Sequence, residues 1–236
     1  MKRLLVILIS LLFCASAQGV ITKTQNTQLM EWTLLTATED AAGIKETAEW
    51  DTSGLYQATL HIDVCLVEAS AHEGTEVIVQ IASEAVVNDS WTDLVRFSMA
   101  ATAVAPTKAD VNAVNSTTTV YCTDPGTANL DECGKNIFIY DTATIANSCI
   151  AYQVTPGVDS GGGHDLITVL DAPLTTDTDC DIYTVTGDNL SAVAQQACVI
   201  PVSISRVRII INNFYDNDGT AANVVARVRG TGLSVL

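Results

Sequence analysis

The feature that most restricts the fold of this chain is an alternation of apolar and polar residues with a period of two. In residues 58–66 every second side chain is apolar, and the residues between them include Thr59, His61 and Asp63. Successive side chains of a strand point to opposite faces of a sheet, whereas a helix needs apolar residues every three to four positions. The alternation therefore predicts a strand with one buried face, as in antiparallel sheets.

The same pattern, rich in Val, Ile and Thr, recurs along the chain. Turn-forming residues such as Asp218 and Gly219 separate the segments. Little helix is expected, and residues 190–198 are the best candidate for a helical turn. We predict an all-β fold, an antiparallel β-sandwich of jelly-roll type. Its strands are expected at 32–37, 58–66, 77–81, 119–122, 137–140, 150–154, 166–170, 202–212 and 223–229.

Residues 1–17 have the order of a secretory signal peptide. Lys2 and Arg3 form a basic head, an apolar run occupies residues 4–13, and small residues follow at positions 15–17. The apolar run is about half of the ~20 residues that a spanning helix needs. We therefore expect cleavage of residues 1–17, secretion to the extracellular space or the cell surface, and no membrane span.

The domain organisation follows from where the alternation begins. Residues 18–31 are mostly polar and weakly patterned, so they are expected to form an N-terminal arm. Residues 32–236 contain no repeat or long linker and are expected to form a single β-sandwich domain. The Ala- and Thr-rich residues 100–115 are expected either to form a long loop or to divide two halves of that domain.

Cysteine usage agrees with export. Removing residues 1–17 takes Cys14 away and leaves six of the seven cysteines, an even number without any CxxC pair. In an exported chain this favours disulfides over metal thiolates or catalytic thiols. We expect three disulfide staples, paired by sequence proximity as Cys122–Cys133 across a turn, Cys180–Cys198 across a hairpin and Cys65–Cys149 as the long-range bridge.

The net charge of the chain limits the classes of partner that it can bind. The formal net charge of -16 would repel nucleic acid and anionic membranes. If the last strands pair with each other, they carry a local basic patch formed by Arg206, Arg208, Arg227 and Arg229. An acidic body with one basic patch can dock onto its own copies, so a homo-oligomer or homopolymer is expected.

The C-terminus is a second candidate for assembly. It is apolar to its last residue, with Leu233, Val235 and Leu236. Such a strand must be buried in the protein's own sheet, which we favour, or be lent to a neighbouring molecule.

Candidate sites for chemistry are sparse. The sequence contains no GxSxG, HExxH, P-loop or Rossmann glycine pattern, so no enzyme is expected. His61 and Asp63 share one strand face and could join His72 as metal ligands, but exposed polar residues of a half-buried sheet explain them better. Calcium is the most plausible inorganic partner, because Asp-rich loops supply hard oxygen ligands. Its candidate ligands are Asp216, Asn217, Asp218, Asp177 and Asp179.

The leading functional hypothesis is therefore a secreted structural protein. It would be a subunit of an extracellular filament, surface coat or matrix that assembles through strand edges or termini. The alternative is a secreted jelly-roll module that binds surface glycans or calcium, in which Trp32, Trp50 or Trp91 could stack on sugar rings if exposed. A hydrolase that uses carboxylates distant in sequence is a third hypothesis.

Overall fold

The computed structural model describes residues 21–36, 43–67, 74–83, 90–99, 107–116, 119–123, 133–159, 164–170, 180–184, 193–201, 206–213 and 223–235. This part of the chain consists of antiparallel strands and one short 3-10 helix, η2 (Ile145–Asn147). The strands are β1 (Ile21–Leu35), β2 (Ile44–Glu46), β3 (Trp50–Asp51), β4 (Gln57–Leu66), β5 (Thr75–Ala82), β6 (Thr92–Met99), β7 (Thr107–Ser116), β8 (Thr119–Thr123), β9 (Lys135–Asp141), β10 (Cys149–Gln153), β11 (Val158–Asp159), β12 (His164–Leu170), β13 (Cys180–Thr184), β14 (Val193–Ile200), β15 (Arg206–Asn213) and β16 (Val224–Val235).

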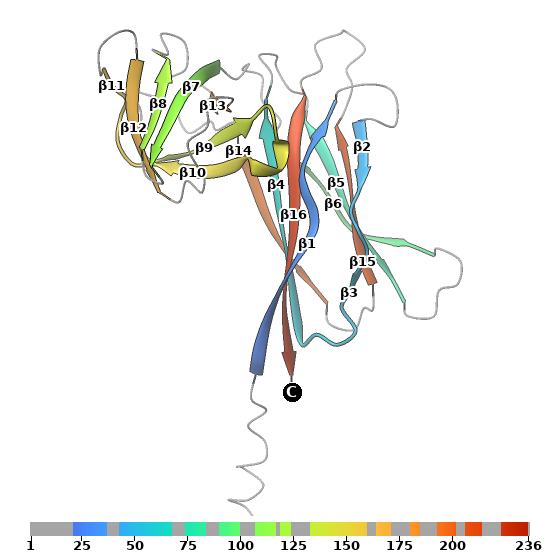
Figure 1. Ribbon diagram of the computed structural model, residues 1–236. Helices are drawn as coiled ribbons and strands as arrows, with labels where there is room; N and C mark the ends of the chain where they lie inside the picture. Colours follow the sequence, from blue (N-terminus) through green and yellow to red (C-terminus); the bar gives the residue numbers. More distant parts are fainter. Residues whose placement is uncertain are drawn as a thin grey trace, which may run out of the picture.

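The strands form three sheets, which are separate in Figure 1. Sheet A has the order β1-β16-β4-β14, and sheet B has the order β2-β15-β5-β6 with β3 also paired to β15. The seven strands from β7 to β13 form the insert sheet, in the order β10-β9-β13-β7-β8-β12-β11. The all-β, antiparallel prediction is therefore confirmed.

Sheets A and B are built by nested pairing of the two ends of the chain. β1 pairs with β16, β2 and β3 pair with β15, β4 pairs with β14, and β5 pairs with β6. The chain therefore resembles one long hairpin whose arms are divided between two sheets. Further pairing of β16 with β4 and of β15 with β5 closes each sheet. The insert sheet lies in sequence between β6 and β14.

Sheets A and B share one hydrophobic core. The apolar residues of the alternating segments, such as Leu60 and Ile62 on β4 and Val207 and Ile209 on β15, are completely buried in it. Trp50 is also buried in this core, and Trp32 is buried against Phe138 of the insert sheet, so neither is an exposed sugar platform. The period-two pattern thus identifies the faces that exclude water.

Two glycines of β16 allow a close approach across this core. A Cβ atom on Gly230 would lie 2.8 Å from the Trp50 ring, and one on Gly232 would lie 2.6 Å from Leu55. Both distances are shorter than any van der Waals contact. The Gly-Thr-Gly sequence before the C-terminus therefore lets Trp50 and Leu55 cover the strand directly.

The insert sheet has two differently used faces. One face forms its own core, with Ile137, Ile139, Ile167, Val169 and Ile182 completely buried. The other face contributes Phe138 and Tyr183 to the core cluster of sheets A and B. The Phe138 ring lies 5.0 Å from the Trp32 ring of β1. The insert therefore covers part of the outer face of sheet A, beside which it lies in Figure 1.

Three sequence predictions differ from the structure. Residues 190–198 were expected to form a helical turn, but Val193–Ile200 is strand β14, because it pairs with β4 over its whole length. Residues 21–31, assigned to an arm, belong to β1 and pair with β16. Residues 107–115 belong to β7 and are therefore not part of a long loop; the alternative, that 100–115 divides two halves of the domain, is not contradicted. The expected single domain spans 32–236, and the insert sheet lies within that range.

Candidate functional site

The four arginines of the predicted basic patch lie on two different sheets. Arg206 and Arg208 are on β15 in sheet B, whereas Arg227 and Arg229 are on β16 in sheet A. β15 and β16 do not pair with each other, so the prediction of one continuous patch is wrong. Each arginine is also within ion-pair distance of a carboxylate: Arg206 and Arg208 each have a glutamate, whereas Arg227 and Arg229 share Asp63.

On the outer face of sheet A the two arginines converge on Asp63 of β4. Arg227 donates from Nε and Nη2 to Asp63 Oδ2 at 3.0 and 2.8 Å, and Arg229 Nη2 donates to the same oxygen at 3.2 Å. The other carboxylate oxygen accepts a 2.8 Å hydrogen bond from Gln195 of β14. Asp63 is 2% exposed, so its charge is held by these donors in place of water.

The insert sheet contributes a further side chain to this cluster. Asn136 of β9 donates to Gln195 Oε1 at 3.0 Å, which links the insert to Asp63 through one side chain. The Arg227 guanidinium stacks over the Trp32 ring, 4.2 Å from its centroid, and that ring contacts Phe138. A polar chain and an aromatic stack thus join the insert to sheet A. We call Asp63, Arg227, Arg229, Gln195 and Asn136 the covered cluster.

Two thiols lie beside the covered cluster. Burial, reinforced by the charge of Asp63, raises the pKa of the Cys65 thiol well above its ordinary value. Burial raises the pKa of Cys149 to about 12, although nearby Arg227 favours the thiolate. Cys149 is also close enough to influence the ionisation of Cys65. Both groups are therefore protonated and poor nucleophiles at neutral pH.

The predicted disulfides are not formed. Cys65, Cys133, Cys149 and Cys198 are free thiols, and each predicted pair contains at least one of them. Cys180–Cys198 fails because β13 belongs to the insert sheet and β14 to sheet A, so the two cysteines are not on one hairpin. In Cys122–Cys133, Cys122 is on β8 and Cys133 is an exposed free thiol. Cys65 and Cys149 are close together but reduced.

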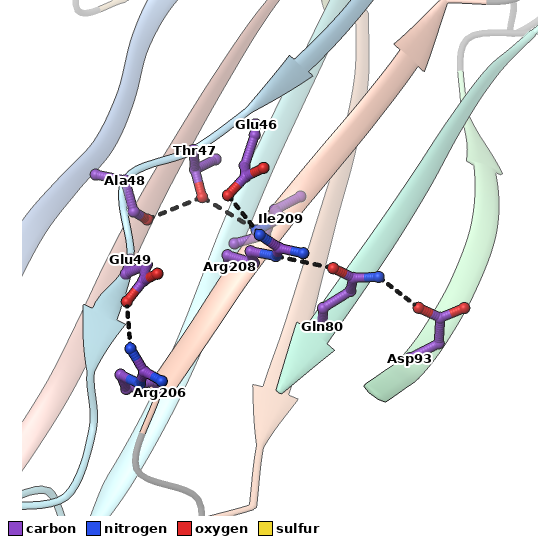
Figure 2. A network of polar contacts seen from close by, with 9 residues as sticks. All are labelled: Glu46, Thr47, Ala48, Glu49, Gln80, Asp93, Arg206, Arg208 and Ile209. Atoms are coloured by element: carbon purple, nitrogen blue, oxygen red, sulfur yellow. Dashed lines mark hydrogen bonds and ion pairs between the residues drawn. The ribbon is translucent and has the colours of Figure 1, made fainter. Parts of the chain in front are cut away.

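The outer face of sheet B carries a longer and more open network, shown in Figure 2. Arg208 donates to Gln80 of β5 and to Glu46 of β2, both at 2.8 Å, and Gln80 donates to Asp93 of β6 at 2.8 Å. The chain of contacts therefore crosses the whole sheet from β2 to β6. Arg206 adds a second link, to Glu49, at 2.9 Å.

Trp91 and Arg96 extend this exposed network. The guanidinium groups of Arg208 and Arg206 lie over the Trp91 ring, 4.3 and 5.5 Å from its centroid. Hydrogen bonds from Gln80 and then from Arg96 lower the pKa of Asp93. Arg96 also contacts Glu76 at 3.2 Å. We call Glu46, Glu49, Gln80, Asp93, Arg96, Arg206 and Arg208 the exposed ladder.

A polar pocket of about 370 Å³ lies where β1, β4 and β16 meet. Its lining is Asn26, Thr27, Gln28, His61, Arg229, Gly230 and Thr231. His61 thus lines the pocket together with Arg229 and polar side chains of β1. Asp63, in contrast, accepts hydrogen bonds from Arg227 and Arg229. The predicted His61–Asp63 metal pair is therefore not assembled. The pocket offers hydrogen-bond donors and acceptors but no aromatic floor.

Several predicted site residues lie outside the described residues. These are residues 1–17, His72 and the calcium candidates Asp177, Asp179, Asp216, Asn217 and Asp218. Among the described residues, no group of three or more His, Cys, Asp or Glu side chains could hold a metal. Within the same ranges no helix is long and apolar enough to cross a bilayer.

The predicted C-terminal assembly residues are inside sheet A. Leu233 pairs with Thr24 of β1 and with Gln57 of β4, and Val235 pairs with Ile21. β16 therefore has a neighbour on each side and is not an edge strand, as expected for burial in the protein's own sheet. Leu236 lies outside the described residues.

Sequence reasoning missed three members of these networks. Gln195 was assigned to a helical turn, and Asn136 and Trp91 were not connected to any charge. The available signal was the Arg-x-Arg pattern on two strands, which needs a carboxylate or an aromatic ring beside each arginine. The identity of those partners depends on strand pairing between residues more than 100 positions apart.

Comparison with known proteins does not assign the chain to a family. No protein-family model matches the chain, and no curated protein matches it. One solved structure, described as "Structure of infectious bursal disease virus Gt strain", aligns at 7% identity over 91% of this chain with a TM-score of 0.24. The alignment covers 42% of that chain, so this protein spans less than half of its length. A similarity at this level does not define a fold relationship.

Proposed function

We propose that sheets A and B form a jelly-roll β-sandwich into which the insert sheet is built. The nested pairing supports this proposal, because folding one long hairpin into two facing sheets produces the double Greek key of a jelly roll. The common core of the two sheets supports it as well. Such a body is compact and rigid, as a building block requires.

The function that we propose is structural: a secreted subunit of an extracellular filament, surface coat or matrix. The observation that carries this proposal is the position of β14 at the edge of sheet A, where, among the described residues, it pairs with β4 and with no other strand. Unpaired backbone groups along a regular edge are a template for another strand. The insert covers part of the outer face of sheet A, and the exposed ladder occupies the outer face of sheet B. The signal-like sequence 1–17 supports export.

Electron microscopy of the mature chain, residues 18–236, tests the structural function. The protein is exported into an oxidising compartment, purified and imaged over a range of concentrations. Ordered filaments, sheets or closed shells are expected at high concentration. A mature chain that stays strictly monomeric by light scattering at every concentration would contradict the proposal. A sample reduced before imaging is the control for artificial cross-linking through exposed Cys133.

The polar pocket favours a second candidate, a glycan-binding module. Its volume lies within the range of small-molecule sites, and its lining suits a ligand rich in hydroxyl or carboxylate groups. Binding on a glycan array is expected to weaken in the Asn26→Ala variant, because Asn26 is an exposed pocket residue whose amide can hydrogen-bond to ligand hydroxyl groups. An array on which the unmodified protein binds nothing would exclude this candidate. Calcium chelation during the assay distinguishes pocket binding from binding through the Asp-rich segments.

A further inference from the structure

The edges of sheets A and B differ in how well they are protected against pairing with another molecule. β1 has three register shifts against β16, and β2 and β3 are only three and two residues long. β6 carries Asp93 and Arg96 and has a register shift against β5. Irregularity, shortness and charge are the devices by which natural proteins block edge-to-edge association.

β14 has none of these protections. It pairs with β4 over eight consecutive residues, from Val193 opposite Cys65 to Ile200 opposite Ala58, without a register shift. Its sequence VAQQACVI contains no charged residue and no proline. Among the described residues, no strand pairs with its other side. From this contrast we propose that β14 pairs with β14 of a second copy of this chain, extending sheet A across a two-fold axis.

The surface of β14 is suited to such a contact. Gln195, Gln196 and Ala197 are exposed, and Val199 is 65% exposed. Gln196 Nε2 donates to the carbonyl of Ala197 at 3.0 Å, and the Cys198 thiol lies 3.9 Å from the carbonyl of Val199. Two backbone carbonyls of β14 are thus contacted by side chains of the same strand. Backbone donors of an added strand can replace these local contacts.

The insert, which contacts β14 through Asn136, also carries exposed apolar residues. Asn136, which donates to Gln195 of β14, is the register partner of Tyr152 on β10. Tyr152 lies opposite Leu170 of β12, and the two are 44% and 52% exposed. Tyr152 and Leu170 are therefore exposed apolar side chains on strands of the insert, next to the strand that contacts β14 through Asn136.

Charge limits where a second copy can dock. The chain has a net charge of -16, so contact between most surfaces of two copies brings like charges together. β14 is an uncharged strip on this acidic body, and antiparallel pairing about a two-fold axis gives both copies the same contact. This inference rests on the proposed structural function and names one of its joints. A two-fold joint alone closes at a dimer, so a filament or coat would use a second contact as well.

The test compares two pairs of lysine substitutions by sedimentation velocity and hydrogen–deuterium exchange. Gln196→Lys with Ala197→Lys places charges on β14, where like charges then face each other across the joint. Thr92→Lys with Ser98→Lys places the same two charges at exposed positions of β6. Both variants lower the net negative charge equally, so overall repulsion cannot explain a difference between them. Circular dichroism and thermal unfolding check that each variant is folded.

We expect the mature protein to dimerise or assemble further, with β14 amides gaining protection as concentration rises. The β14 variant is expected to raise the dissociation constant at least about tenfold, and the β6 variant to leave it unchanged. Assembly that is equally strong in the β14 variant would overturn this joint while leaving the structural function standing. A β14-dependent dimer without larger assemblies would keep the joint and remove the filament or coat. A monomeric mature protein would remove both.

Discussion

The same sequence pattern, Arg-x-Arg on the outward positions of a strand, occurs once in sheet B and once in sheet A. On β15 of sheet B it is Arg206 and Arg208, and on β16 of sheet A it is Arg227 and Arg229. One arginine of each pair is similarly sheltered, since Arg208 is 19% exposed and Arg227 is 20% exposed. Each of these two also stacks on a tryptophan, Trp91 or Trp32. Their carboxylate partners differ completely, because Asp63 is 2% exposed whereas Glu46 is 48% exposed.

The difference shows that the burial of the carboxylate determines how much an ion pair contributes to stability. In the covered cluster Asp63 has lost its water, and only the arginines and Gln195 compensate its charge. In the exposed ladder the glutamates keep much of their hydration, so each pair exchanges water for arginine with little net gain. The covered cluster therefore fixes the geometry of sheet A and its insert, whereas the exposed ladder leaves sheet B adjustable.

The largest expected effect is on the covered cluster. Asp63→Asn keeps the side-chain shape but removes the charge that holds Arg227 and Arg229. Because a sheltered arginine is then left without its carboxylate, we expect a loss of about 3–5 kcal/mol in the free energy of unfolding, measured by urea denaturation. The matched control is Glu46→Gln, which makes the same change at the exposed ladder. Equal losses in the two variants would contradict the comparison.

Alkaline pH is expected to weaken the covered side of sheet A through its thiols. Burial raises the pKa of Cys149 to about 12, and that of Cys65 is raised as well. A raised thiol pKa gives stability that is complete below the unfolded value, about 8.5, and is lost as pH rises toward the folded value. At pH 10 the loss from Cys149 alone is about 2 kcal/mol.

Thermal unfolding between pH 8 and pH 10.5 measures this loss, and Cys149→Ser is the control. The serine does not ionise in this range, so its curve should fall less steeply than that of the unmodified protein. Other alkaline groups, including Tyr140 with its raised pKa, titrate in both proteins and cancel in the difference. Identical slopes would mean that Cys149 is not a free thiol, as in the Cys65–Cys149 bridge expected as the remaining, long-range pair.

Much of the fold follows from alternation within single strands. β4, β5 and β15 were predictable because each has an apolar residue at every second position of its sequence, and the faces that carry these residues contribute to the core as expected. β14 was not, because its sequence VAQQACVI has no clear period and its strand form depends on pairing with β4. The arginine patch and the Cys180–Cys198 bridge failed for one reason. Both assumed that strands close in sequence are neighbours in space, whereas nested pairing separates them.

The smallest expected effect concerns the exposed ladder itself. Arg208→Gln removes the bonds to Glu46 and Gln80 and the stacking on Trp91, all at the surface of sheet B. We expect a loss below about 1 kcal/mol at low salt, because exposed pairs contribute little. Salt above the physiological range should shrink even this difference, since it screens exposed charges. Urea denaturation at two salt concentrations measures both effects.

The same experiment on Asp63→Asn should show little salt dependence, because salt screens a buried carboxylate far less. A strong dependence there would mean that water reaches the covered cluster.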